Sequence, residues 1–429
     1  MKRHVPDDLS LTSQRPSRLY YGWVMVGVTV IGGLSLAPGQ SYAIGEFKHA
    51  LLADLGLGES MLSSLYGIAT FIAGFMALFA GVAMDRFGLR RAITVSVLLL
   101  GASCFFASRV TGPVSVFFAF LLLRTFGHSV LPLMTGTTLA MWFRRRLGFV
   151  NGLAGVLVTT MAAGIPPLYI ALIGAYGWRQ AWVILGIGTC VVMLPIMWLL
   201  FRNHPEDVGQ HIDGAADDTP NPQRRADDTA DVAFDLTAAR RTRAYWCLIA
   251  LHSVHGMVFA AVMFHRVQIF DDRGHTVGQA ATMFAIFSLC AAAMQFFGGF
   301  MADRLPLRFL LTCTSFCTAS ALLILGVGNG IAGAYLFGAL YGLGTGTEIV
   351  GRNTAWPRFF GTAHIGKIKS RGAMAAVLGS SVGPIIAGAS FDQFGSFAPA
   401  VILLAALYSG VGAAMLFAKT DPPSPLKSP

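Results

Sequence analysis

Ionisable side chains interrupt several long apolar runs of this chain, well away from the ends of each run. Arg124 and His128 are four residues apart in the run 114–142 and therefore share a helix face. Arg124 stands about 15 Å into this run at about 1.5 Å per residue. A charge at that depth in a membrane costs several kcal/mol, which marks a candidate functional residue. We expect Arg124 and His128 to bind an anionic substrate; the alternative is a structural arginine that bonds backbone carbonyls of a neighbouring helix.

A second charged set lies in the run 331–357. Tyr341, Glu348 and Arg352 are spaced seven and four residues apart, on one helix face. Glu348 and Arg352 have the favourable order for an ion pair at i, i+4. This pair either neutralises itself for structural reasons, or Glu348 carries a coupling proton while Arg352 and Tyr341 contact the substrate.

Histidines in the run 244–270 are further candidates for proton coupling, because histidine titrates near neutral pH. We expect this role for His255, and for His265 nearer the end of the run. In the first run, the Pro38-Gly39 pair should interrupt the helix and free backbone groups. The neutral side chains expected to bind substrate are Gln40, Tyr42, Tyr66 and Gln295.

The elements that must position these residues are membrane-spanning helices. The chain is 55% hydrophobic and 12% charged, whereas soluble proteins have about 25% charged residues. Runs of this length can cross about 30 Å of hydrocarbon. The first run lacks a small-residue cleavage site, so we expect a retained helix. We predict an all-α membrane protein with twelve transmembrane helices at about 22–46, 59–84, 92–111, 114–142, 148–174, 180–201, 244–270, 276–302, 309–328, 331–357, 372–391 and 397–418.

The basic residues are distributed unevenly between the two sides of these helices. If both termini lie inside, the tails and even-numbered loops hold 24 of the 31 Lys and Arg residues. The odd-numbered loops hold only four, including Lys48, and Glu46 is expected at the outer border. This asymmetry follows the positive-inside rule. We therefore expect cytoplasmic termini in a bacterial inner membrane, and no nucleic-acid partner.

The chain also repeats itself. The stretch DRFGLRR at residue 85 returns as DRLPLRF at residue 303, an offset of 218, and RTFG at 124 overlays YGLG at 341, an offset of 217. Residues 202–242 are polar and too poor in apolar surface to fold alone. We expect two pseudo-symmetric six-helix halves, 1–201 and 243–429, joined by a cytoplasmic linker at 202–242. Such repeats are typical of transporters that rock about a central site.

The stretch GVAMDRFGLRR, 81–91, resembles the loop 2–3 signature of the major facilitator superfamily, and Arg124-x-x-Gly127 resembles that family's second signature. The resemblance implies that the loop is a conformational latch between the halves. The stretches APGQSYAIGEF, WFRRRLGFVNGLAG and RFFGTAHIGKI resemble the monocarboxylate and oxalate–formate branch, whose usual arginine in span 8 is replaced here by Gln295. The latch residues that the resemblance implies are Gly81, Asp85, Arg86, Gly88, Arg90 and Arg91, with Asp303 and Arg304 in the second copy.

No nucleotide-binding loop, nucleophile elbow or metal-ligand spacing occurs in the sequence, so we expect no enzyme, no cofactor and no metal. The six cysteines lie in apolar runs and are interpreted as small hydrophobic side chains. The leading hypothesis is a monomeric secondary transporter that moves a small organic anion, a carboxylate, by proton symport through alternating access. The alternatives are a proton-driven exporter of drugs or metabolites, and a transporter-like sensor that no longer transports.

Overall fold

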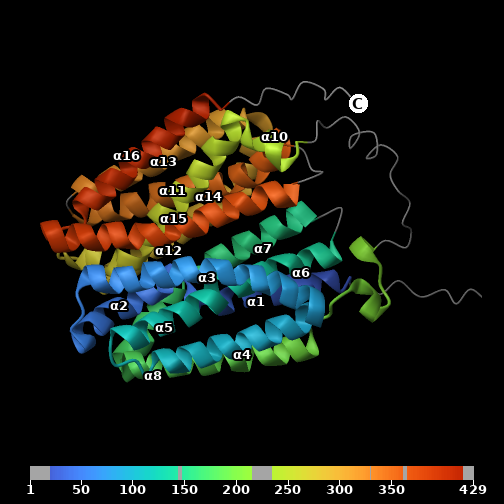
Figure 1. The fold of residues 1–429 in the computed structure, drawn as a ribbon, viewed down its shortest axis with the longest axis horizontal. Helices are drawn as coiled ribbons and strands as arrows, with labels where there is room; N and C mark the ends of the chain where they lie inside the picture. Colours follow the sequence, from blue (N-terminus) through green and yellow to red (C-terminus); the bar gives the residue numbers. More distant parts are fainter. Residues whose placement is uncertain (1–19, 144–146, 215–233, 329, 361–364, 419–429) are drawn as a thin grey trace, which may run out of the picture.

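The computed structural model describes residues 20–143, 147–214, 234–328, 330–360 and 365–418. This part of the chain consists of helices and their connections, without a strand (Figure 1). By length and composition, nine helical stretches of the described residues can cross a membrane. One of them, Phe149–Leu199, has 51 residues and breaks at Gly177, where φ is 75°, so it is long enough to cross twice.

The first half carries the first six crossings. The first and fourth crossings are each built from two helices with a short irregular helix between them. The elements are α1 (Gly22–Ser35), η1 (Ala37–Gly39), α2 (Ser41–Leu55), α3 (Glu59–Phe87), α4 (Leu89–Ala107), α5 (Pro113–Arg124), η2 (Thr125–Val130), α6 (Leu131–Trp142), α7 (Leu147–Ala162) and α8 (Ile165–Leu199).

Short helices η3 (Pro205–Val208), η4 (Ile212–Gly214) and α10 (Leu236–Arg240) precede the second half. In that half each crossing is one continuous helix. Its elements are α11 (Arg243–Asp271), α12 (Val277–Arg304), α13 (Leu307–Val327), α14 (Ile331–Phe360), α15 (Ile365–Phe394) and α16 (Ala398–Leu416). With α3 and α14, of 29 and 30 residues, the described helices account for the twelve predicted crossings.

The internal repeat of the sequence is also a repeat of the fold. The helices α12, α13 and α14 begin at residues 277, 307 and 331, each 218 residues after α3, α4 and α5 at residues 59, 89 and 113. The turns within the two copies differ. Gly88 has φ 78°, which favours glycine, whereas Pro306 has φ −57° in the equivalent turn.

Each half has its own apolar core, and helices α2, α3 and α7 of the first half pack against α11, α15 and α12 of the second. Figure 1 shows the two halves side by side, with α15 of the second half along α3 of the first. Phe264 of α11 joins the core of the first half, so the two cores meet there. We call the end where α2 passes into α3 and α11 into α12 the α2–α3 end.

The predicted interruption of the first crossing is confirmed. Pro38 and Gly39 form a 3-10 turn, and Gln40 is extended with φ −86° and ψ 149°. The next helix, α2, continues to Leu55, nine residues beyond the end that hydropathy predicts at 46. As a result Lys48, which was assigned to an outer loop, lies within a helix.

Candidate functional site

Arg124 is the last residue of α5 and is completely buried. Its Nε donates to Thr70 Oγ1 at 2.9 Å, and its Nη1 donates to the carbonyl of Gly39, also at 2.9 Å. The guanidinium lies over the ring of Tyr66, 5.1 Å from the centroid, and the Tyr66 hydroxyl donates to Ser41 at 2.7 Å. Within the described chain, Nη2 has no hydrogen-bond partner, and no carboxylate pairs with Arg124.

The carbonyl of Gly39 reaches this arginine because the first and fourth crossings touch at two glycines. A Cβ on Gly39 would lie 2.5 Å from the Cα of Gly127, and a Cβ on Gly127 would lie 2.6 Å from the Cα of Gly39. The first turn of α2 bonds to the carbonyl of Gln40, which leaves the Gly39 carbonyl outside the helical ladder. The break in the first crossing thus supplies a backbone acceptor for Arg124.

His128 lies in η2, a π-helical turn that starts directly after Arg124. Its Nδ1 is 3.3 Å from Gln40 Oε1, and Gln40 Nε2 donates to the carbonyl of Gly127 at 2.8 Å. Turns of this type are frequent at functional sites because they release backbone groups from the helical pattern. Gln40, Tyr66, Arg124 and His128, four of the predicted substrate-binding residues, therefore lie together.

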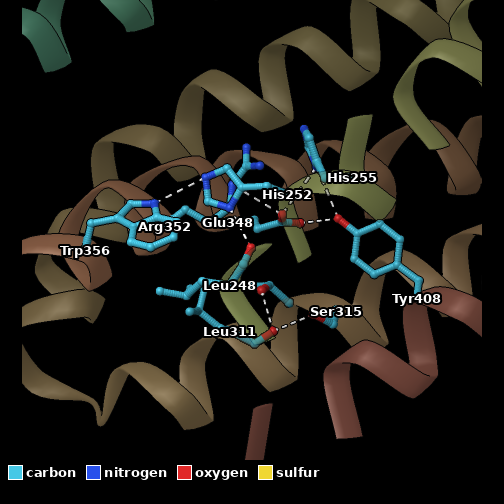
Figure 2. Close-up of polar contacts among 10 residues, drawn as sticks. Leu248, His252, His255, Leu311, Ser315, Glu348, Arg352, Trp356 and Tyr408 are labelled. Carbon is cyan, nitrogen blue, oxygen red and sulfur yellow. Dashed lines mark hydrogen bonds and ion pairs between the residues drawn. The ribbon is translucent and has the colours of Figure 1, made fainter. Parts of the chain in front are cut away.

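A second polar centre surrounds Glu348 in α14, which is completely buried (Figure 2). Arg352 Nε and His255 Nδ1 lie 3.3 and 3.4 Å from Glu348 Oε1. The hydroxyl of Tyr408 in α16 donates to the other carboxylate oxygen. The ion pair that the i, i+4 spacing predicts is present, and it has two further partners from α11 and α16.

The hydrogen bonds around this centre distinguish its two histidines. Because the Tyr408 hydroxyl donates to Glu348, its oxygen can accept from His255 Nδ1 at 3.1 Å, and the His255 side chain stays 12% exposed. His252 is different, since its Nδ1 donates to the Leu248 carbonyl at 2.8 Å and its Nε2 accepts from Trp356 at 3.4 Å (Figure 2). Both ring nitrogens of His252 therefore have hydrogen-bond partners, whereas Nδ1 of His255 faces the Glu348 carboxylate and the Tyr408 hydroxyl.

A third polar group joins the two halves near the α2–α3 end, and we call Lys48, Glu59, His265 and Gln268 the cross-half cluster. Lys48 Nζ is 2.5 Å from Glu59 Oε2 and 2.5 Å from His265 Nδ1. Gln268 Nε2 donates to Glu59, and Ser63 Oγ is 3.3 Å from His265 Nε2. Lys48, Glu59 and Ser63 come from the first half, whereas His265 and Gln268 come from the second.

Glu46 and Arg266 form a second ion pair between the halves, and both side chains are about 1% exposed. The sequence-based expectation that Glu46 borders the outside and that Lys48 lies in an outer loop is wrong. The extension of α2 carries both residues into the interface, where Arg266 and Glu59 compensate their charges. Isolated charges would not be stable at such buried positions.

The remaining predicted binding residues form no hydrogen bond with these groups in the described part of the chain, although Tyr42 and Tyr341 lie near charged members of them. Tyr42 packs against Phe284 of the other half, with ring centroids 4.9 Å apart, and Arg266 lies over the same Phe284 ring. Gln295 Nε2 donates to Thr159 Oγ1 at 3.0 Å and so links α12 to α7. Tyr341 is completely buried, and its hydroxyl has no partner among the described residues.

The predicted latch is described in part. Arg90 Nε donates to the carbonyl of Met197 at 3.0 Å, and a terminal nitrogen donates to that of Trp198 at 2.5 Å, so Arg90 binds the end of α8 in its own half. Arg86 lies over the ring of Phe87, Arg91 is exposed, and Arg304 ends α12. The side chains of Gly81, Asp85 and Asp303 lie outside the described part of the structure.

Sequence reasoning missed Ser41, Lys48, Glu59 and Tyr408. Hydropathy assigned Lys48 and Glu59 to the borders of spans, where charges are ordinary. The signal for Tyr408 was the one phenolic hydroxyl in the apolar run 397–418, a run that contains no charged residue before Lys419. Among the described residues, no group of three or more His, Cys, Asp or Glu side chains could hold a metal ion.

The fold and these buried polar groups are those of a membrane transporter, and the comparison with protein families agrees. The family profile of the Major Facilitator Superfamily matches residues 29–270 and 259–429. The chain belongs to this superfamily and is a transporter, not an enzyme.

Within the superfamily, the chain is similar to monocarboxylate transporters. It is 25% identical over 196 residues to monocarboxylate transporter 3 of Gallus gallus, covering 43% of this chain and 34% of that protein. It is 26% identical over 183 residues to monocarboxylate transporter 4 of Gallus gallus, covering 40% and 37%. The chain thus spans about a third of the length of the curated relatives it matches.

Solved structures show the same fold at lower identity. A bacterial homolog of the human lysosomal transporter Spinster, in an inward-facing and unoccupied conformation, superposes with a TM-score of 0.71 at 14% identity. The match covers 95% of this chain and all of the other. The inward-facing and occupied conformation gives a TM-score of 0.70, covering 94% and 97%.

Proposed function

We propose that the chain transports a small organic anion with one negative charge, a monocarboxylate, by alternating access. The observation that carries this proposal is Arg124, a completely buried guanidinium without a carboxylate partner in the described chain. A buried charge without compensation is unfavourable by several kcal/mol. A substrate carboxylate that accepts from the unpartnered Nη2 would supply the missing charge.

The balance of charges supports a monoanion over a dianion. Each buried carboxylate among the described residues already has a cationic partner. Of the buried arginines and lysines described, Arg124 is the one without a carboxylate partner. The pairs are Glu46 with Arg266, Glu59 with Lys48, and Glu348 with Arg352. The relatives named monocarboxylate transporters support the same substrate class.

The coupling ion in this proposal is a proton, bound by Glu348 and His255 together. Glu348 is completely buried, whereas His255 is 12% exposed and contacts both the carboxylate and Tyr408. Two groups this close exchange protons as a coupled pair. His255, the more exposed of the two, passes the proton to Glu348, which holds it. When the substrate anion approaches Arg352, it competes with Glu348 for the guanidinium and so favours protonation of Glu348. One substrate anion and one proton are then bound together and carried in the same direction, as symport requires.

The proposed state is inward-facing and the proposed location is a bacterial inner membrane, with both termini in the cytoplasm. The charge asymmetry of 24 basic residues against three, now that Lys48 lies within α2, supports this orientation. The ion pairs between the halves gather near the α2–α3 end, which would close the outer side. The fold shared with an inward-facing Spinster homolog agrees with that state. We propose that the monomer is the working unit.

Uptake into proteoliposomes tests the proposal. Radiolabelled monocarboxylates, dicarboxylates and organic cations would be offered with and without an inward proton gradient. We expect accumulation of a monocarboxylate that requires the gradient. Accumulation of cations against the gradient would favour the exporter, and saturable binding without uptake would favour the sensor; either result would refute the proposal.

A further inference from the structure

An open hollow lies at the α2–α3 end, beside the cross-half cluster. It has a volume of about 420 Å³ and is lined from both halves. Gln268, which lines the hollow, also donates to Glu59. The Gln268 side chain therefore lies between water in the hollow and the Glu59 carboxylate, which is only 6% exposed. The other lining residues are His49, Leu52, Ala53, Asp271, Asp272 and Phe391.

The protonation states of the cluster follow from its contacts. His265 Nε2 lies 3.1 Å from the carbonyl of Pro384, which can only accept, so this nitrogen carries the ring proton. Nδ1 is then a lone pair that accepts from the Lys48 ammonium at 2.5 Å. Lys48 bridges a neutral imidazole of the second half and the Glu59 carboxylate of the first. Glu59 supplies the negative charge that keeps the ammonium in this bridge.

We propose that Glu59 is a proton-binding site that controls the contact between the two halves at the α2–α3 end. The ionised carboxylate stabilises this contact, and the protonated form allows the halves to separate. Ionised Glu59 stabilises Lys48 in its bridge to His265, so this contact between the halves depends on its charge. The same carboxylate accepts from Gln268, and this second contact is stronger when Glu59 is ionised. A proton that enters through the hollow and binds Glu59 leaves Lys48 as an uncompensated buried cation. Separation of the halves then hydrates the ammonium, so protonation favours the open state of this end.

The neighbouring charges do not replace Glu59. Arg266 is paired with Glu46, and Asp392 of α15 accepts from the backbone N–H of Ser60 at 3.1 Å. These groups face the cluster from α2, α11 and α15, and the hollow adds His49 of α2 with Asp271 and Asp272 at the end of α11; α3 contributes Glu59 itself. Of these groups, only Glu59 contacts the Lys48 ammonium, so its titration controls the bridge.

A distance measurement between the halves tests this proposal. Spin labels would be attached at Gly58→Cys and Val277→Cys, both exposed positions at the α2–α3 end, in a variant without the six native cysteines. Electron–electron double resonance in lipid nanodiscs would compare about pH 8 with about pH 5, without substrate. We expect one short distance at the higher pH and an added longer distance at the lower pH. Glu59→Gln should show the longer distance at both, with the pH dependence lost.

Asp54→Asn is the matched control, because Asp54 is an exposed carboxylate of α2 that pairs with Arg179 of its own half. It should keep the wild-type pH response. If Glu59→Gln does not fold, Lys48→Met tests the same bridge and should also open at both pH values. The proposal would be overturned if the distance between the two labels in the otherwise unchanged protein did not depend on pH. It would also be overturned if the Glu59→Gln variant kept the same pH response as that protein. Since no substrate is used, this outcome is independent of which anion the protein carries.

Discussion

At the residue scale, the two arginines expected to bind an anion have different surroundings. Arg352 is held by Glu348 and is 11% exposed, whereas Arg124 is completely buried and bonded only to neutral groups. The sequence left open whether Arg124 bonds a backbone carbonyl for structural reasons or binds the substrate. Each hypothesis concerns a different nitrogen of its guanidinium. Nη1 bonds a backbone carbonyl, and Nη2 is unpartnered in the described chain.

Both Arg124→Lys and Arg124→Gln should weaken substrate binding, and Gln should do so more severely. Lysine keeps the charge, but its single nitrogen cannot bond Thr70, Gly39 and a substrate carboxylate in one geometry. Loss of a hydrogen bond to a charged group costs about 1.5 to 3 kcal/mol, so affinity should fall by about 10- to 100-fold. Isothermal titration of the purified protein with the transported anion measures this change.

Thr70→Val is the control for Arg124, because it removes one partner and keeps the guanidinium. Its affinity should fall less than that of Arg124→Gln. Normal affinity in Arg124→Gln would show that the arginine serves structure alone.

Glu348→Gln should permit exchange of internal for external substrate and abolish accumulation driven by a pH gradient. The neutral amide imitates the protonated carboxylate but cannot release a proton. Counterflow and pH-driven uptake, measured on the same proteoliposomes, separate the two activities. Glu206→Gln, at an exposed carboxylate of η3, should leave both unchanged. If Glu348→Gln still accumulated substrate on a pH gradient, His255 would be the group to test next.

At the scale of elements, the surroundings of Arg124, the proposed anion site, depend on the contact between two interrupted helices. The Pro38-Gly39 break positions a free carbonyl, and the glycine pair allows the fourth crossing to bring Arg124 to it. Glycine is needed there for space, because its φ is ordinary while any side chain would meet backbone atoms.

Gly39→Ala should therefore destabilise the first half. Its Cβ would lie 2.4 Å from the carbonyl oxygen of Leu123, which cannot move without shifting α5. Overpacking of this kind costs about 1 to 3 kcal/mol. Thermal unfolding in detergent should show a lower midpoint, with weaker anion binding. Gly27→Ala, in the same crossing with nothing within 4 Å, should leave the midpoint unchanged or raise it; equal losses in both variants would contradict this account.

Much of this organisation of helices could be predicted from the sequence. The features that could not be predicted depend on contacts between helices that are far apart in the chain. Apolar length and helical spacing predicted the twelve crossings, the break at Gly39 and the Glu348–Arg352 pair, because these depend on neighbours along one chain. Contacts between distant helices could not be predicted. Glu59 meets Gln268 only when α3 approaches α11, and Tyr408 meets Glu348 only when α16 approaches α14.

At the scale of the whole molecule, the proposed anion site at Arg124 and the cross-half cluster are linked by stacked rings. Tyr66 lies under Arg124 and stacks on Phe264 with centroids 4.2 Å apart, and Phe264 precedes His265 in the chain. Movement of either half must therefore disturb both sites. Under the proposed function, this chain of contacts is a physical route by which substrate binding at Arg124 alters the contact between the two halves.

Topology is the first prediction at this scale. Pro220→Cys, in the linker between the halves, should be shielded from a membrane-impermeant maleimide added to whole cells, because we expect the linker in the cytoplasm. Gly58→Cys, at the opposite face, should react. Labelling of position 220 from outside would reverse the proposed orientation.

Asp85→Asn should slow transport more than it weakens substrate binding, because the latch resemblance places Asp85 at the cytoplasmic rim, remote from the substrate. Initial uptake rates and equilibrium binding on the same preparation measure the two effects. Lost affinity with normal turnover would instead place Asp85 in the binding site.

The π-helical turn Thr125–Val130 follows directly on a one-residue change in the offset of the repeat. The helices α5 and α14 start 218 residues apart, yet the RTFG and YGLG stretches are 217 apart, so the first copy has one residue more than the second ahead of Arg124. The corresponding helix of the second half, α14, is continuous from Ile331 to Phe360. The fourth crossing therefore departs from its partner twice, in its length before Arg124 and in its winding after it, so the surroundings of Arg124 are not duplicated in the second half.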